Sequence, residues 1–271
     1  MKKTLRMLAA ALALGAAGTA HATPSTQIWI PSTDIQKYGT VHLGVDTYNT
    51  VAKKTGTEGG FSVINYGLTV GVLPPSVSDK LGIEVGLDYR DLTGSAGAVA
   101  DAPFFYNAKL GLNEGAFGEY SPAFAIGGYD FGGKDDSSMS GLNTQSNIVY
   151  GLAAKTFETL GRFSVGYFSG NDKVLVEVSD PAQKANTGIL ASWDKSLTDK
   201  WWAAVDYMGG KSSYGALSFG ICYYMVPDAS FIVGYDIYND SNIKPTITFQ
   251  LDVNFAAFDG KPEHPHHSEH E

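Results

Sequence analysis

The chain has 271 residues and a formal net charge of −9, which argues against nucleic acid and anionic lipid surfaces as partners. Its one cysteine, Cys222, excludes an internal disulfide, and the absence of any apolar run of roughly 18 residues excludes a membrane-spanning helix. The composition, with 32 glycines, 15 tyrosines and 14 phenylalanines, fits one all-β domain, as either a soluble sandwich or a membrane barrel.

The N-terminus predicts the compartment. A basic start (MKK) precedes a run of small apolar residues at 7–17, and AHA at residues 20–22 matches the A-x-A cleavage pattern. These features are typical of a secretory signal peptide, here residues 1–22, because the apolar run is too short to anchor the chain in a bilayer. Residues 23–39 contain two prolines and no period, and we interpret them as a periplasmic lead-in.

Alternation of polar and apolar residues begins at Thr40 and recurs in twelve segments. Most have about the 9 to 11 residues with which a tilted strand crosses the hydrocarbon of a membrane. The predicted strands are residues 40–49, 61–72, 81–91, 104–112, 122–131, 147–157, 162–170, 186–194, 201–209, 214–226, 230–238 and 244–255. Residues 173–178 (KVLVEV) also alternate and could extend a neighbouring strand.

The two faces of these strands favour a membrane barrel over a sandwich. One face is uniformly apolar, while the other carries much Gly, Ser and Ala, which suits a confined lumen. The longest connections, residues 92–103, 132–146 and 171–185, all fall at one end, which is the loop asymmetry of outer-membrane barrels. We therefore predict an all-β fold: a closed up-and-down antiparallel transmembrane β-barrel of about 12 strands over residues 40–255.

This combination resembles a Gram-negative outer-membrane β-barrel of the porin-like kind. The resemblance implies a location in the outer membrane, contact with outer-membrane lipids and two periplasmic termini. It also implies that the barrel assembly machinery recognises the last strand, where Phe249, Leu251, Val253 and Phe255 would form the signal. Sixteen residues follow Phe255, whereas this signal usually ends the chain.

The predicted inner face is acidic, so a conducting pore should favour cations or neutral solutes. Its acids are Asp46, Glu84, Asp88, Asp130, Asp194, Asp206, Asp236 and Asp252, and its bases are Arg90, Lys109, Lys155 and Arg162, with His42 neutral. One hypothesis is a cation-attracting ring at the pore mouth, formed by Asp46, Asp88, Asp130, Asp206 and Asp236. The alternative is that these carboxylates cap loops or pair with lumen bases.

Aromatic residues divide between the two faces. A girdle toward lipid is predicted for Tyr89, Tyr129, Tyr207 and Tyr235. Five aromatic residues would face inward and constrict the lumen: Phe105, Phe157, Phe168, Tyr224 and Tyr238. Because twelve strands lie between the filled interior of eight and the open channel of sixteen, these residues favour a narrow pore.

Other chemistry is weakly supported. A lipid-facing hydrolase would need a Ser and a His in reach of each other, but the only histidine of the predicted barrel, His42, falls on the inner face. The tail, residues 256–271, carries His264, His266, His267 and His270 and could bind a transition metal or remain a disordered periplasmic segment.

We therefore predict no enzyme, no cofactor and no nucleic-acid partner. The predicted function is a narrow outer-membrane diffusion channel for small cationic or neutral solutes. A non-conducting scaffold, plugged by its own side chains and residues 23–39 or housing another component, is the main alternative. The sequence leaves the oligomeric state open.

Overall fold

A computed structural model describes residues 25–51, 61–94, 103–133 and 144–257. The predicted signal peptide and the histidines of the tail lie outside these residues. The twelve strands are β1 (Thr40–Thr50), β2 (Phe61–Gly71), β3 (Leu81–Gly94), β4 (Phe104–Leu112), β5 (Ala123–Gly132), β6 (Gln145–Phe157), β7 (Gly161–Ser169), β8 (Thr187–Thr198), β9 (Trp201–Met208), β10 (Ala216–Val226), β11 (Ala229–Tyr238) and β12 (Thr246–Ala256). In the described part of the chain, no helix is long and apolar enough to cross a membrane.

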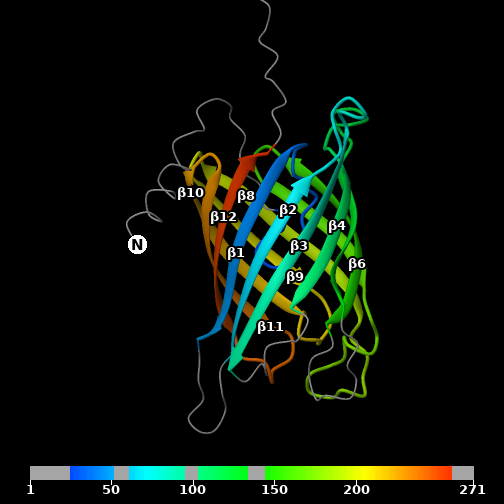
Figure 1. The fold of residues 1–271 in the computed structure, drawn as a ribbon, viewed down its shortest axis with the longest axis vertical. Helices are drawn as coiled ribbons and strands as arrows, with labels where there is room; N and C mark the ends of the chain where they lie inside the picture. Colours follow the sequence, from blue (N-terminus) through cyan, green and yellow to red (C-terminus); the bar gives the residue numbers. More distant parts are fainter. Residues whose placement is uncertain (1–24, 52–60, 95–102, 134–143, 258–271) are drawn as a thin grey trace, which may run out of the picture.

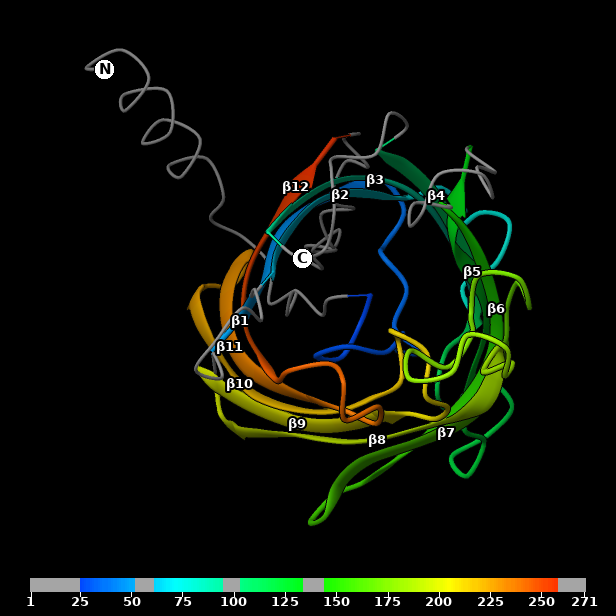
Figure 2. The same cartoon turned by 90° about the horizontal axis from the view of Figure 1, so that it is seen from below.

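The strands form one closed antiparallel barrel (Figures 1 and 2). Each strand pairs with its neighbour in sequence, and β1 pairs with β12 from Thr40↔Ala256 to Thr50↔Thr246. The predicted fold is confirmed, with strand bounds displaced by only a few residues. Residues 173–178 form no strand of the barrel and contribute only an isolated bridge, Val176↔Lys184, in the connection between β7 and β8.

The outer surface of the barrel is largely apolar because most outward residues of its strands are aliphatic or aromatic. Side chains such as Ile126 and Val165 are more than half exposed. Aromatic rings pair across neighbouring strands toward both ends: Tyr66, Tyr89 and Phe104 form one run, and Trp201 contacts Tyr223. The outward position predicted for Tyr89 is confirmed.

The interior contains part of the chain itself. Residues 25–36, here called the inner segment, lie inside the barrel before the chain enters β1 (Figure 2). They form a tight turn in which the Gln27 N–H donates to the Ile30 carbonyl at 2.8 Å. The sequence predicted a lead-in here, and the structure places its described residues within the lumen.

One half of the interior is filled by apolar side chains. This cluster comes from β6 to β9, the inner segment and the connection between β7 and β8, and consists of Ile30, Ile148, Tyr150, Leu152, Phe168, Leu175, Leu190 and Met208. The inward position predicted for Phe168 is confirmed. Because these residues occupy the β6 to β9 side, any passage must run along the opposite wall.

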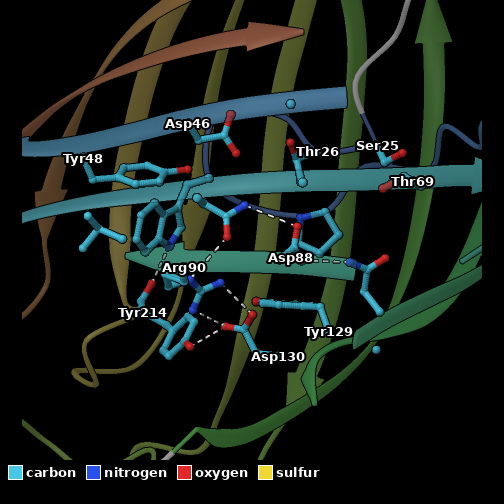
Figure 3. Close-up of a pocket in the computed structure, with 18 of the residues that line it drawn as sticks. Ser25, Thr26, Asp46, Tyr48, Thr69, Asp88, Arg90, Tyr129, Asp130 and Tyr214 are labelled. Carbon is cyan, nitrogen blue, oxygen red and sulfur yellow. Dashed lines mark hydrogen bonds and ion pairs between the residues drawn. The ribbon is translucent and has the colours of Figure 1, made fainter. Parts of the chain in front are cut away.

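In β5 a bulge breaks the predicted alternation. The pairing with β6 shifts between Tyr129 and Phe131, and Asp130 has a φ of 56°. A bulge adds one residue to a strand and so reverses which side chains face inward beyond it. Tyr129 and Asp130 both line the interior (Figure 3), and the prediction that Tyr129 faces lipid is wrong.

In β6 the predicted parity is inverted. The buried residues are Ser146, Ile148, Tyr150, Leu152 and Ala154. Phe157 is therefore on the other face, where its ring contacts Phe163, and Lys155 pairs with Glu114 at 2.9 Å beyond the barrel wall. The predictions that Lys155 and Phe157 line the lumen are wrong, because β6 carries apolar residues on both faces and apolar character alone could not identify the outer one.

Candidate functional site

A cavity of about 570 Å³ lies between the inner segment and the wall formed by β1, β2 and β3 (Figure 3). The wall contributes residues from the inner face of these strands: His42, Gly44, Asp46, Tyr48, Val63, Asn65, Gly67, Thr69, Glu84, Asp88 and Arg90. The inner segment contributes Ser25, Thr26 and Trp29 to the other side. Since a strand rises about 3.3 Å per residue, the seven residues from His42 to Tyr48 give the cavity a length of about 20 Å.

Three ion pairs neutralise most of the charge on this wall. Arg90 contacts Asp130 at 2.8 Å and Lys109 contacts Glu84 at 3.1 Å. His42 Nε2 lies 3.3 Å from Asp252, and its Nδ1 lies 2.8 Å from the Asn254 side-chain oxygen. An imidazolium can donate to both oxygens, so His42 can balance Asp252.

Asp46 and Asp88 remain without a basic partner. Among the described residues, no Lys, Arg or His side chain forms an ion pair with either carboxylate. Asp88 accepts hydrogen bonds from the amides of Asn65, at 3.3 Å, and Asn107, at 2.9 Å, which are neutral groups. The described wall of the cavity therefore carries two carboxyl groups without an ion-pair partner near the middle of β1 and β3.

Arg90 is held in place from several sides. It donates to both oxygens of Asp130, at 3.2 and 2.8 Å, and its guanidinium lies 4.3 Å from the Phe105 ring centroid. The Tyr214 hydroxyl also donates to Asp130 (Figure 3), and the Trp29 indole donates to the Tyr214 carbonyl at 2.7 Å. This network joins the wall, a connection at the barrel end and the inner segment into one polar unit.

The predicted ring of five aspartates is only partly assembled. Asp46, Asp88 and Asp130 line the cavity, although Asp130 is neutralised by Arg90. Asp206 instead accepts backbone N–H groups of the inner segment, and Asp236 accepts the Thr246 hydroxyl at 2.7 Å. The carboxylates thus divide between the open cavity and structural hydrogen bonds.

Apart from Lys155, the remaining predicted lumen residues also bind the inner segment or the wall. Lys109 donates to three carbonyl groups of the inner segment, and Arg162 binds Asp34 and Asp194. Sequence reasoning missed the cavity role of Trp29. Its signal was the apolar run IWIP at residues 28–31, which begins six residues after Ala22 at the predicted cleavage site and fits no strand.

On β12, Phe249, Leu251 and Phe255 face outward and are exposed, while Val253 is half-buried. Their recognition by an assembly factor stays a prediction. In the part of the chain that the structure describes, no group of three or more His, Cys, Asp or Glu residues could hold a metal ion.

The connection between β7 and β8 folds back over one end of the barrel. Leu175 is fully buried in the apolar cluster, and the Val178 N–H donates to the Lys211 carbonyl. Asp240 fixes this connection from the opposite side, because its carboxylate accepts the backbone N–H of Asn242 at 2.9 Å and of Ser179 at 2.7 Å.

These two hydrogen bonds predict a pH dependence. The N–H of Asn242 and then that of Ser179 hold the pKa of Asp240 below its usual range. A carboxyl group whose pKa is lower in the folded state stabilises the fold at any pH above its pKa in the unfolded chain, which is about 4. This stabilisation is lost as the pH falls through the pKa of the folded state. Above about pH 5, the midpoint temperature of thermal unfolding should be higher for wild type than for Asp240→Asn. This difference in midpoint should disappear toward pH 2. A constant difference across this range would contradict the assignment.

The fold and the cavity define a closed, porin-like β-barrel with a polar cavity along one wall. No protein-family model matches the chain, and neither does any curated protein. Solved structures of similar fold include the KdgM porin, with a TM-score of 0.45 at 7% identity over 81% of this chain and 99% of that one. The translocator domain of autotransporter NalP from Neisseria meningitidis gives 0.40 at 12% identity over 94% of both chains. Salmonella typhi OmpF in complex with daunomycin gives 0.38 at 10% identity over 80% of this chain and 97% of that one.

Proposed function

We propose that the chain is an outer-membrane β-barrel that acts as a narrow diffusion channel for small cationic or neutral solutes. The observation that carries this proposal is the elongated polar cavity beside β1 to β3, on whose wall Asp46 and Asp88 form no ion pair with any Lys, Arg or His that the structure describes. Negative charge in a confined space concentrates cations and repels anions.

The membrane location rests on the outer surface. Aliphatic and aromatic side chains cover most of the outside of the barrel, and a soluble protein rarely exposes so large an apolar surface. Lipid acyl chains would cover this surface, and the aromatic pairs near both ends would lie at the membrane interfaces. Export by the N-terminal signal, insertion by the barrel assembly machinery and periplasmic termini belong to the same proposal.

Planar-bilayer recording tests the proposal. Wild type should conduct with a cation preference, because Asp46 and Asp88 in their ionised form raise the local cation concentration. The double substitution Asp46→Asn and Asp88→Asn should lower the cation-to-anion permeability ratio severalfold, which reversal potentials in a salt gradient measure. An anion-selective wild type, or an unchanged ratio in the double variant, would refute the cation preference.

The matched control removes two charges elsewhere. Asp79 and Asp199 lie in exposed turns at the end of the barrel where β1 begins, and neither lines the cavity. Asp79→Asn with Asp199→Asn makes the same change in net charge and should leave the permeability ratio close to that of wild type.

A second candidate function is a non-conducting scaffold. Two features favour it: the apolar cluster occupies the β6 to β9 side of the interior, and the inner segment also lies inside the barrel. Correctly folded wild type that shows no conductance in bilayers would favour this alternative. A lipid-facing hydrolase gains no such support, since His42 points inward and both ring nitrogens contact Asp252 and Asn254.

A further inference from the structure

The turn of the inner segment is bound by wall side chains through its backbone. Asp206 Oδ2 accepts the N–H groups of Ile28 at 2.8 Å and Trp29 at 2.9 Å, with Ile30 at 3.5 Å. Gln250 donates from β12 to the Ile28 carbonyl at 2.8 Å. The wall thus satisfies both the donors and the acceptor that this turn exposes, which a buried loop requires.

The rest of the inner segment is held by charged side chains. Lys109 Nζ donates to the carbonyls of Ser25 at 2.8 Å and Asp34 at 2.7 Å. Arg162 binds the Asp34 carboxylate with two hydrogen bonds, at 2.6 and 2.8 Å. Glu84 accepts the Gln36 N–H at 2.8 Å. These anchors come from β3, β4 and β7, so the segment is attached around the circumference of the barrel.

Two pairs of glycines form sockets for side chains of the inner segment. Gly82 and Gly111 face each other on β3 and β4, and a Cβ at either would lie 2.7 or 2.5 Å from Ile35. Gly220 and Gly234 do the same for Ile28 on β10 and β11, where a Cβ would lie 2.7 or 2.8 Å from it. Only residues without a side chain fit at these positions, so the wall is shaped to the segment.

We propose that the inner segment is the element that sets the cross-section of the pore, and that Asp206 is its main positioning residue. This inference rests on the proposed channel function. The segment borders the cavity through Ser25, Thr26 and Trp29, so its position fixes the width that β1 to β3 leave open. Hydrogen bonds, ion pairs and two glycine-lined sockets hold the segment. Water can replace each polar contact when the segment moves away from the wall.

The test changes the wall position that contacts the inner segment and leaves the residues that line the cavity unchanged. At Gly82 the three atoms nearest to a new Cβ all belong to Ile35, so Gly82→Val should push the segment away while leaving the wall intact. Hydrogen–deuterium exchange of the folded protein in detergent, read by mass spectrometry, should show about tenfold faster exchange in the inner segment. Single-channel conductance should at least double. Adding Ile35→Ala should slow the exchange again, because it removes the side chain that clashes.

Two further variants complete the design. Asp206→Ala removes the acceptor of the turn and should accelerate exchange, whereas Asp206→Asn keeps an oxygen at this position and should restore most of the protection. Gly151→Val is the matched control: a strand glycine whose Cβ would meet only Ile126, at 3.9 Å, and no part of the inner segment. In this variant the hydrogen–deuterium exchange rate of the inner segment and the single-channel conductance should both equal those of wild type.

The outcomes separate this inference from the proposed function. Exchange that stays at the wild-type rate in Gly82→Val and Asp206→Ala would overturn the positioning of the segment. Faster exchange with unchanged, measurable conductance would overturn its role in pore width. Faster exchange with no conductance in any variant, including wild type, would remove the channel proposal while the seating of the segment stands.

Discussion

Replacing Ile221 with arginine is expected to lower the free energy of unfolding of the bilayer-inserted barrel by about 2–4 kcal/mol. Ile221 lies in the middle of β10 on the outer face, where its side chain is 42% exposed. In a membrane this position meets acyl chains, which cannot hydrate a guanidinium. Urea unfolding in lipid vesicles measures the change.

Met225 on the same strand is the matched control. It is 45% exposed on the same face but lies one residue from the end of β10. Because the cost of a charge falls to about 0–1 kcal/mol near the interface, Met225→Arg should be nearly neutral. Equal, small effects at both positions would mean that water surrounds the barrel, and the membrane proposal would fail.

Replacing Arg90 with methionine is expected to destabilise the barrel by about 3 kcal/mol, at the lower end of the range for breaking a buried ion pair. Asp130 is 2% exposed and would keep a buried charge without its cation. The lower end applies because the Arg90 side chain is 20% exposed to the cavity, where water screens it. Urea unfolding in vesicles provides the measurement.

The double variant Arg90→Met with Asp130→Asn separates the ion pair from packing. Asparagine tolerates the positive φ at this position and removes the unpaired charge. More than half of the lost stability should return. If the double variant is as unstable as the single one, the loss comes from the packing of Arg90 on Phe105 and not from the uncompensated carboxylate.

The single variant Arg90→Met should also increase the cation preference of the pore, since it removes a positive charge from the wall of the cavity.

The strands could be predicted because their outer face meets a uniform environment. On β12, Phe249 and Leu251 alternate with Thr248 and Gln250, and the period identifies both the strand and its outward side. This signal needs no knowledge of neighbouring strands. It fails only where the backbone changes parity, as at Asp130, or where both faces are apolar, as around Ile148.

The inner face has no such uniformity, and the site could be predicted only in part. Asp46 and Asp88 face the cavity as predicted, but Asp206 and Arg162 bind a segment that lies 128 to 178 residues away in the chain. Small residues on the inner face predict a confined lumen but not what occupies it. Gly82 and Gly220 instead receive Ile35 and Ile28, which sequence spacing cannot show because the segment has no period.

The seam between β1 and β12 has a consequence for how the barrel forms. Its eleven residue pairs join the first strand to the last, across about 200 residues of intervening chain. Contacts of such long sequence separation form late and slowly, so an unfinished chain would present two unpaired strand edges. A chain that lacks only β12 would therefore have no smaller closed barrel to adopt. Assembly of the barrel should be all-or-none and should depend on completed synthesis of the chain.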